Sequence, residues 1–519
     1  MKWLTVQYAF SIYLPVAFGL TPPIPYPPLR QCIAPFEQSI DHDNPGFGIS
    51  LNRIFNQTYW YNATFWKGPG SPVILFTPSE IAATGYMSYL ADQTLPGQIA
   101  KEVGGAVVLI EHRYWGNSTP YQVQTTKNLQ FLNLDQSVVD FVPFAQAVEL
   151  PFALDARSDA SDTPWIWSGG SYSGALGAWI ESIAPGTFWA THSGSGPVEA
   201  IFDYWQYFDP IQEEMPKNCS EDYAAIIGHV DEVFTSGTRK EVDNLKKLFG
   251  LQNLSHLDDA AAAISSPIWA WQSIQFTSSY SEFYQMCDAI EGFFPDLTWL
   301  PNGSNPRVVG LEFKAHYPPG YYASYSYHEW KGSYNVAFFD TYNASSPMFT
   351  DQSGANMFDR TWVWMTCNNP VFYYQTGAPA NRSTVFSRLT NPDYWQLQCR
   401  LFFPKECEFT YASALGKTAS DVNVHTKGWR LPEYLDDESR LLWVNGEFDP
   451  WRPASVASEC PSILISGARH CDDLRVQDAI NLVVKRPKRP LYLRAKWTNE
   501  FYATRRDQRI AKEYRQIKG

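Results

Sequence analysis

Three short stretches of this chain carry side chains that could act together in nucleophilic catalysis. They read SGGSYSG at 168–174, NGEFDPW at 445–451 and GARHCDD at 467–473. A serine hydroxyl is a poor nucleophile until a base removes its proton, and a histidine base works best when a carboxylate fixes its tautomer and stabilises the imidazolium. We therefore predict Ser171 as the nucleophile, His470 as the base and Asp449 as the acid of one catalytic site.

The residues around Ser171 fit a strained turn between a strand and a helix. Such a nucleophile elbow is written G-x-S-x-G, because the turn leaves no room for large side chains two residues before and after the serine. Here Gly169 stands before Ser171 and Ser173 stands after it. Ser173 is the alternative nucleophile, although its own neighbours Ser171 and Ala175 fit the pattern less well. The remaining alternative is a glycine turn that has no chemical role.

The acid and the base each have a competitor. Asp449 is preferred because Pro450 halts regular structure and holds the side chain in a loop, and Glu447 is the fallback. His470 follows an apolar run and a glycine. His112 is its main rival, but it precedes the serine, whereas the order Ser, Asp, His is that of α/β-hydrolases.

Two backbone N–H groups are expected to stabilise the negative charge that develops on the substrate oxygen. We assign one of them to Tyr172, the residue after the proposed nucleophile. The other is expected in the loop FTPSE at 76–80.

Apolar runs of strand length lead into these stretches. The first three lie within SPVILFTPSE at 71–80, GGAVVLIEHRYWG at 104–116 and DTPWIWSGG at 162–170. Continuous apolar runs are typical of strands buried on both faces of a parallel sheet. Strand-like sequence resumes at 360–367, 439–451 and 462–473. Since sites in such sheets lie beyond the carboxyl ends of the strands, the three chemical stretches are expected at one edge.

Helical patterns dominate from about residue 200 to residue 350, among them SEDYAAIIGHVDEVF and RKEVDNLKKLFGL. We predict an α/β fold of the α/β-hydrolase kind, in which a mostly parallel sheet has helices on both faces and carries a mainly helical cap insertion. The predicted division is a signal peptide at 1–19, a first core part at 20–200, the insertion at 201–350, a second core part at 351–484 and a basic tail at 485–519.

The first residues indicate secretion. The mostly apolar stretch 1–19 predicts a signal peptide, with a membrane anchor as the alternative. No later run approaches the roughly 20 apolar residues of a membrane span. Eight Asn-X-Ser/Thr sequons predict glycans on surface loops, at Asn56, Asn62, Asn117, Asn218, Asn253, Asn302, Asn343 and Asn381.

Cysteine content and charge agree with a secreted enzyme. In an oxidising compartment the 8 cysteines are expected mostly to pair. The chain has no CxxC or HExxH spacing, and we expect neither a metal site nor a cofactor. A net charge of −13 disfavours nucleic acid and anionic membranes as partners, and it gives a weak argument for activity in acid. The tail at 485–519, with 12 Lys and Arg against 3 Asp and Glu, has no assigned role.

A set of motifs resembles one family of serine peptidases, which includes lysosomal prolyl carboxypeptidase, dipeptidyl peptidase II and the fungal acid prolyl endopeptidases. The motifs are LIEHRYWG at 109–116, GGSYSG at 169–174, FDPW at 448–451 and GARHCDDL at 467–474. The resemblance implies an α/β-hydrolase core with a helical cap and cleavage on the carboxyl side of proline. Ser171, Asp449 and His470 fall on the family's triad. Trp451 falls on a wall of the proline pocket, where an indole face packs well on the ring.

Two departures from the family's pattern bear on the type of activity. The mammalian members carry a glycine in place of Ser173, and a glutamate shortly after the cysteine that matches Cys367, where this chain has Asn368 and Asn369. That glutamate is suited to hold the free amine of a substrate, so its absence weakens a dipeptidyl-aminopeptidase function. Both differences favour the fungal endopeptidase branch. We add Glu80 as a second candidate for substrate binding.

We therefore predict a secreted serine peptidase, extracellular or else vacuolar or lysosomal, that cuts proline-containing peptides or proteins after proline at acidic pH. A Pro-X carboxypeptidase is the first alternative, and it would need a cation such as Arg113 or Arg452 for the terminal carboxylate. An esterase or lipase and a non-catalytic binding protein on the same scaffold are further alternatives. The oligomeric state stays open, with a dimer as one alternative.

Overall fold

The computed structural model describes most of the region that carries the predicted site. The described residues are 32–43, 54–153, 158–275, 281–290, 339–356, 359–368, 374–427, 440–456 and 462–475. The predicted signal peptide, the basic tail and Asn302 lie outside these ranges. Within them, no helix combines the length and the apolar character needed to cross a membrane.

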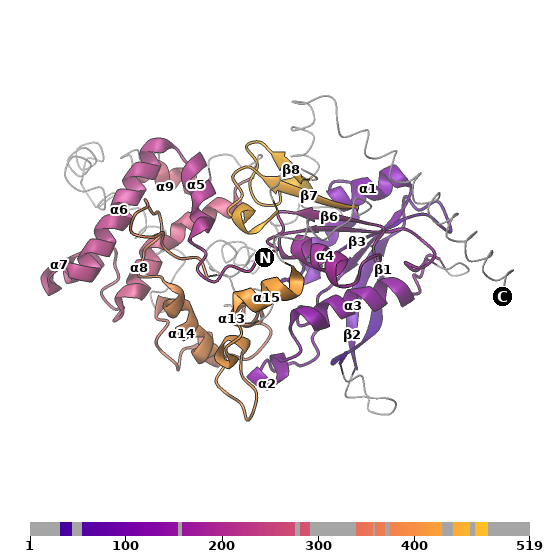
Figure 1. Ribbon diagram of the computed structural model, residues 1–519, viewed down its shortest axis with the longest axis horizontal. Helices are drawn as coiled ribbons and strands as arrows, with labels where there is room; N and C mark the ends of the chain where they lie inside the picture. Colours follow the sequence, from indigo (N-terminus) through magenta and orange to yellow (C-terminus); the bar gives the residue numbers. More distant parts are fainter. Residues whose placement is uncertain are drawn as a thin grey trace, which may run out of the picture.

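One eight-stranded sheet forms one side of the molecule (Figure 1). In spatial order its strands are β1 (Cys32–Ser39), β2 (Ile54–Asn62), β4 (Ala106–Ile110), β3 (Val73–Phe76), β5 (Trp165–Gly170), β6 (Ala190–Gly194), β7 (Leu441–Gly446) and β8 (Ser462–Ile465). Strand β2 is antiparallel to both of its neighbours, and every pair from β4 to β8 is parallel. The carboxyl ends of six strands therefore share one edge.

Helices cover both faces of this sheet. Val73 and Leu75 point into a core shared with α3 (Leu134–Ala147) and α4 (Tyr172–Ile183). The alternate residues Ile74 and Phe76 pack on the other face with η2 (Ala83–Leu90) and α1 (Leu95–Val103). Burial on both faces explains why the strand sequences are continuously apolar. The arrangement confirms the predicted α/β-hydrolase fold class.

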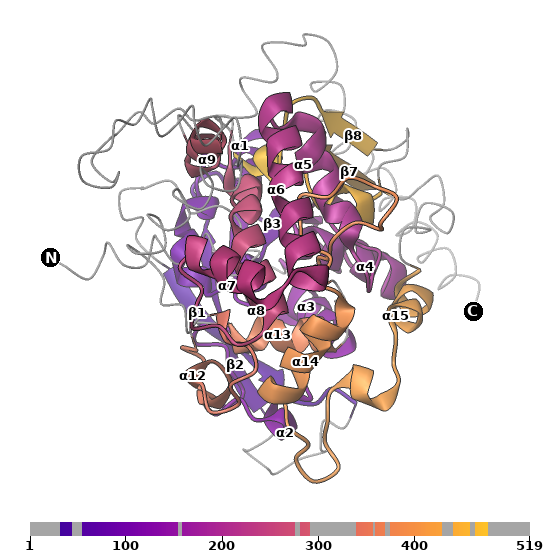
Figure 2. The same ribbon diagram turned by 90° about the vertical axis from the view of Figure 1, so that its left-hand side faces the viewer.

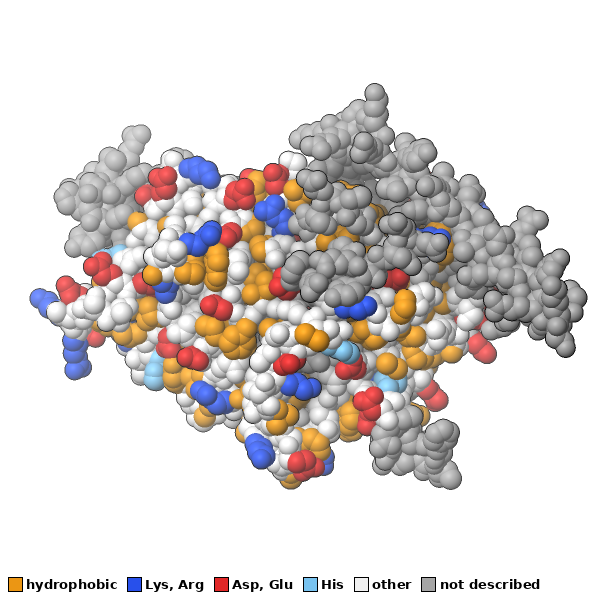
Figure 3. All heavy atoms as spheres, viewed as in Figure 1, with side chains coloured by type: hydrophobic (Ala, Val, Ile, Leu, Met, Phe, Trp, Pro, Cys, Tyr) orange, Lys and Arg blue, Asp and Glu red, His pale blue; other side chains and the backbone are white. Residues whose placement is uncertain are grey.

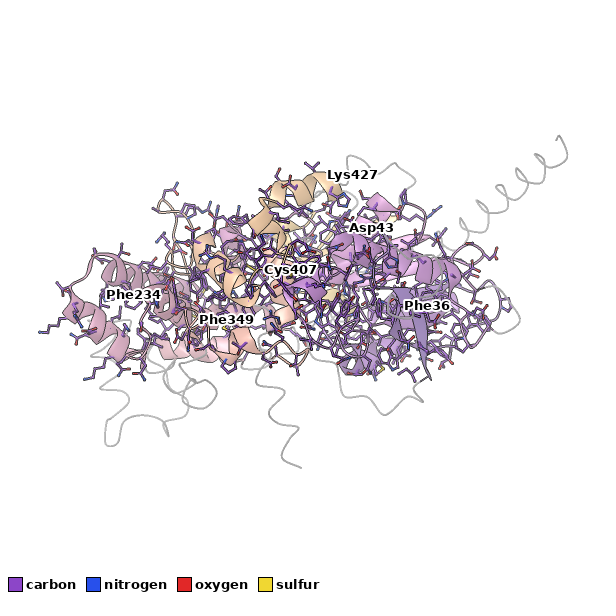
Figure 4. All side chains as sticks on the ribbon, turned by 90° about the horizontal axis from the view of Figure 1, so that it is seen from below. Phe36, Asp43, Phe234, Phe349, Cys407 and Lys427 are labelled. Carbon is purple, nitrogen blue, oxygen red and sulfur yellow. A yellow bond between two sulfur atoms is a disulfide. The ribbon has the colours of Figure 1, made fainter. Side chains whose placement is uncertain are left out.

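Between β6 and β7 the described chain forms helices and loops. One group lies at the end of the molecule away from β1 (Figures 1 and 2), and its members are α5 (Asp209–Glu214), α6 (Lys217–Ser236), α7 (Arg239–Leu248), α8 (Leu257–Ser265) and α9 (Glu282–Ile290). The later helices are α12 (Pro347–Thr350), α13 (Arg360–Cys367), α14 (Pro392–Phe402) and α15 (Ala419–Thr426). Seen from below, Phe234 of α6 and Phe36 of β1 mark the two ends (Figure 4). The boundaries proposed at residues 200 and 350 stay a prediction.

Short helices complete the described part of the fold. They are α2 (Thr126–Leu129) and the 3-10 helices η3 (Trp205–Phe208), η4 (Ser266–Ser273), η6 (Ala412–Leu415), η8 (Arg452–Ala454) and η9 (Asp472–Leu474). Helices η8 and η9 follow β7 and β8 directly in the chain and belong to the loops that carry Asp449 and His470.

The prediction of a strand at 360–367 is wrong, because RTWVWMTC forms the helix α13. Its aromatic and β-branched side chains favour strands on their own. Asp359 caps the helix by accepting a hydrogen bond from the N–H of Trp362 over 3.2 Å. A disulfide joins Cys367, the last residue of α13, to Cys399 of α14. Tertiary contacts therefore override the local preference.

The predicted pairing of cysteines is confirmed for four of them. Cys219 of α6 pairs with Cys287 of α9, in addition to the pair between α13 and α14. Cys407 is an exposed free thiol, and Cys471 is a buried free thiol beside His470. Both disulfides fasten helices that lie between β6 and β7.

Candidate active site

Ser171 lies at a sharp turn between β5 and α4, at the carboxyl edge of the sheet. Its backbone angles are φ 58° and ψ −133°, which are strained for any residue other than glycine and mark functional turns. Its N–H donates to the carbonyl oxygen of Gly194, at the end of β6, over 2.9 Å. The structure thus shows a strand, a tight turn and a helix in this stretch.

Small residues allow that turn to close. A Cβ atom on Gly169 would lie 2.5 Å from both the carbonyl oxygen and the Oγ of Ser173, so only glycine fits there. A Cβ atom on Gly174 would lie 2.7 Å from the carbonyl oxygen of Gly194. Ser173 is fully buried, and its Oγ has no hydrogen-bond partner in the described part of the chain. Ser173 therefore packs inside the turn.

Asp449 and His470 form a hydrogen-bonded pair in the loops that follow β7 and β8. The Nδ1–H of His470 donates to Oδ1 of Asp449 over 3.0 Å, and the same oxygen accepts the N–H of Trp451 over 2.9 Å. This bond sets the tautomer of the imidazole and makes Nε2 an acceptor. Nε2 has no partner among the described residues, and both side chains are almost fully buried.

The two competing residues are engaged elsewhere. Glu447 accepts hydrogen bonds from Ser466 Oγ over 2.7 Å and from the N–H of Gly467 over 2.8 Å, so it ties the loop after β7 to the loop after β8. His112 is fully buried, with its Nε2 3.3 Å from the hydroxyl of Tyr172. Burial lowers the pKa of His112 to about 4. His112 is therefore a neutral hydrogen-bonding group within the core.

The residues expected to line an oxyanion hole lie at the amino end of α4 and in the loop after β3. Tyr172 is the first residue of α4, where helical N–H groups lack intrahelical partners. In the loop, Ser79 has a φ of 58° and donates its N–H to Thr77 Oγ1 over 3.1 Å. Glu80 is 3% exposed and its Oε1 has no partner among the described residues. Burial raises the pKa of Glu80 well above its usual value.

Trp451 lies beside His470 in an aromatic group. Its ring centroid is 6.5 Å from that of His470, 5.5 Å from Tyr204 and 5.3 Å from Tyr207. Its Nε1–H donates to Gln272 Oε1 over 3.0 Å, and the hydroxyl of Tyr207 donates to the same oxygen over 2.8 Å. No signal in the sequence marks Gln272, which comes from η4. The place of Trp451 on a wall of a proline pocket stays a prediction.

The two cations considered for a terminal carboxylate have different surroundings. Arg113 is fully buried, and its Nε and Nη2 donate to both carboxylate oxygens of Asp140 over 2.6 Å. Its Nη1 donates to the carbonyl oxygens of Ile40 and Phe131, so Arg113 is not available to a substrate. Arg452 directly follows Trp451, and its side chain is 26% exposed with Glu213 3.6 Å away.

Together these groups can carry out acyl transfer to a serine. The site offers a serine in a strained turn, an imidazole with one free nitrogen, a carboxylate that orients it and the amino end of a helix. Among the residues described, no cluster of three or more His, Cys, Asp or Glu is suited to hold a metal ion.

Comparisons with known proteins agree with this chemistry. The model of a family described as serine carboxypeptidase S28 matches residues 38–488. The chain is 43% identical to the serine protease vicPb of Bipolaris victoriae, over 91% of this chain and 92% of that one. It is 31% identical to a probable extracellular serine carboxypeptidase of Arthroderma benhamiae, over 80% and 59% of the two chains. It is 23% identical to the lysosomal Pro-X carboxypeptidase of Pongo abelii, over 90% and 88%.

Proposed function

The chain belongs to the serine carboxypeptidase S28 family and is a serine-type peptidase, and we propose that it cleaves peptide bonds on the carboxyl side of proline through Ser171, His470 and Asp449. The observation that carries this assignment is the 3.0 Å hydrogen bond between His470 and Asp449, at the sheet edge where Ser171 occupies a strained elbow. Secretion into an acidic environment is part of the proposal.

In the proposed mechanism, Ser171 Oγ attacks the carbonyl carbon of the scissile bond while His470 Nε2 takes its proton. Asp449 holds the imidazole in the required tautomer and stabilises the imidazolium. The N–H of Tyr172 stabilises the oxyanion of the tetrahedral intermediate. The imidazolium then protonates the leaving amine. A water molecule, activated by the same imidazole, hydrolyses the acyl-enzyme.

Two observations support specificity for proline. Trp451, Tyr204 and Tyr207 form a buried aromatic group beside His470, and aromatic rings pack well against the apolar ring of proline. One relative of similar length is named a Pro-X carboxypeptidase. Glu80 is proposed as a second substrate-contacting residue, because it is buried in the loop after β3 with one oxygen lacking a partner.

A Pro-X carboxypeptidase is the second candidate function. Such an enzyme needs a cation that holds the terminal carboxylate of the substrate, and Arg452 directly follows Trp451 in the chain. Its nearest acidic partner, Glu213, is 3.6 Å away and largely exposed, so the guanidinium is only weakly held. Two relatives are named carboxypeptidases.

The proposal is tested by mapping the cleavage products of proline-rich peptides by mass spectrometry at pH 4 and pH 7. Peptides with free and with amidated C-termini separate the two modes of cleavage. We expect internal cuts after proline in both kinds of peptide, and cleavage of free C-termini alone would favour the carboxypeptidase. Ser171→Ala should lower kcat/KM by several orders of magnitude while leaving the fold intact.

Ser173→Ala is the matched control, because Ser173 has the same chemistry two residues away. It should retain most of the activity, and labelling by a fluorophosphonate should map to Ser171. If Ser171→Ala stayed active and Ser173→Ala did not, the nucleophile would be Ser173. A folded protein that is neither labelled nor active would be a non-catalytic binding protein. Cleavage of short esters without any cleavage of prolyl peptides would indicate an esterase.

A further inference from the structure

A second set of serine, histidine and aspartate side chains lies close to the proposed site. Their hydrogen bonds link β5, β6 and the loop after β8. Ser168 of β5 has its Oγ 3.3 Å from Nδ1 of His192 in β6, and Nε2 of His192 is 2.8 Å from Oδ2 of Asp473. Ser168 is fully buried, and the side chains of His192 and Asp473 are only 5% and 9% exposed. The proposed mechanism does not use any of these three residues.

This hydrogen-bonded network is not a second catalytic triad. Ser168 lies in the middle of β5, directly opposite His192 in the register of the two strands. Its regular strand conformation lacks the sharp turn that presents a nucleophile to a substrate. Ser168, His192 and Asp473 therefore form a hydrogen-bonded network within the core. The role of this network follows from the elements that it connects.

This network connects strand β6 to the loop that carries His470. Asp473 lies in that loop and belongs to η9. The same loop is also bound just beyond β6, since the N–H of Cys471 donates over 3.0 Å to the Oγ of Ser195, the residue that follows the strand. A Cβ atom on Gly194 would lie 2.4 Å from Oδ2 of Asp473, so the carboxylate sits directly against the strand.

The end of β6 also binds the turn that carries Ser171. The carbonyl oxygen of Gly194 accepts the N–H of Ser171 over 2.9 Å. Strand β6 and the residue after it thus bind the backbone of the proposed nucleophile through Gly194 and the loop of the proposed base through His192 and Ser195. These hydrogen bonds connect the turn of Ser171 with the loop of His470.

We propose that His192 and Asp473 are positioning residues, which set the place of His470 relative to Ser171 by fastening the His470 loop to β6. This inference rests on the proposed function, because it assumes that Ser171 and His470 act together. Without the bond from His192 the loop keeps only its other attachments, and a shift of the imidazole by about 1 Å can lower turnover by about 100-fold.

Three variants of the protein test the proposal. His192→Phe removes both ring nitrogens at similar volume. His192→Gln places an amide N–H near the position of Nε2 and can still donate to Asp473, whereas His192→Asn is too short to reach it. The measurements are kcat and KM on a prolyl peptide, the rate of fluorophosphonate labelling of Ser171 and the thermal midpoint.

We expect His192→Phe and His192→Asn to lower kcat about 10- to 100-fold with little change in KM, and His192→Gln to restore most of the loss. The labelling rate should follow kcat. The matched control is His42→Phe, which breaks a bond of 2.8 Å to Asp140 outside the loops of Asp449 and His470. It should lower the thermal midpoint without lowering kcat.

Wild-type kcat in His192→Phe and His192→Asn would overturn the proposal, and so would a loss that His192→Gln does not restore. If His192→Phe does not fold, the proposal is tested by comparing the kcat of His192→Gln with that of His192→Asn. A failure of the proposed function would give a different result. In that case the wild-type protein itself would neither be labelled at Ser171 by the fluorophosphonate nor cleave prolyl peptides.

Discussion

Glu80 and Asp359 are buried carboxyl groups whose ionisation the folded protein opposes. Burial raises the pKa of Glu80 well above its usual value, and a negative charge on Asp359 raises it further. Burial also raises the pKa of Asp359 to about 7. A buried carboxylate without full compensation is costly, so both groups hold their protons in acid. The folded protein therefore favours the protonated, neutral form of both carboxyl groups.

We expect the free energy of unfolding to fall as the pH rises from about 4 to about 7. In the unfolded chain the two carboxyls ionise near their ordinary pKa values, whereas the folded chain retains the protons to higher pH. The stability that depends on the neutral forms is therefore complete below the unfolded pKa values and is lost as the pH passes the folded ones. Thermal midpoints between pH 4 and pH 7 measure this decline.

Glu80→Gln should make that decline shallower, because its amide stays neutral at every pH. Glu37→Gln changes an exposed carboxyl on β1 and should leave the slope as it is. A Glu80→Gln variant with the slope of the wild type would show that Glu80 does not contribute to the pH dependence.

Residue types and spacing predict some members of the site and not others. Ser171, Asp449 and His470 could be proposed because nucleophilic catalysis restricts which side chains can take part and in which order they occur. Gln272 and His192 carry no such pattern. Gln272 accepts the hydrogen bond of Trp451 across 179 residues of sequence, and only the tertiary fold brings the two together.

At the scale of elements, strands could be predicted where burial on both faces leaves a continuous apolar run. This holds for β3, β4, β5 and β7. Strand β6 has the sequence ATHSG, which has no apolar run, and it is a strand because β5 and β7 pair with it on both sides. The helix α13 shows the opposite error, since its residues favour a strand and its cap and disulfide impose a helix.

Removing the disulfide between α13 and α14 should destabilise the protein. The bond between Cys367 and Cys399 joins residues 32 apart in the sequence. In the chain-entropy account a cross-link over a loop of this length contributes about 4 kcal/mol to the free energy of unfolding. We expect the Cys367→Ser/Cys399→Ser variant to unfold at a clearly lower temperature, as measured by calorimetry.

Cys407→Ser provides the control for that measurement, since Cys407 is an exposed free thiol in the described structure (Figure 4). It should unfold at the temperature of the wild type. If the double variant did so as well, the cross-link would not contribute to stability, and the packing of α13 alone would hold the helix.

At the scale of the whole molecule, the described residues on the visible face are mixed in charge (Figure 3). Figure 3 shows acidic and basic side chains interspersed over the visible face, with hydrophobic atoms between them. The exposed sequon asparagines in the described chain are Asn56, Asn117, Asn218, Asn253, Asn343 and Asn381. Asn62 differs from them, because it is only partly exposed and its Nδ2 donates to the carbonyl oxygen of Leu90 over 2.7 Å.

We expect glycans at the exposed asparagines and little or none at Asn62, whose side-chain nitrogen is held by Leu90. Mass spectrometry of the protein expressed in a eukaryotic host, after enzymatic deglycosylation in heavy-oxygen water, measures the occupancy of each site. Complete occupancy of Asn62 would contradict this expectation and would mean that the bond to Leu90 forms only after glycosylation.

The order of the strands also has a consequence for biosynthesis. Ser171 precedes the helices described between β6 and β7, whereas Asp449 and His470 follow them. A ribosome adds about 5 to 20 residues per second, so about 15 to 60 s separate the synthesis of the proposed nucleophile from that of its base. During that time the nascent chain cannot complete its site. Under the proposed mechanism, peptidase activity therefore arises only after β7 and β8 have joined the sheet.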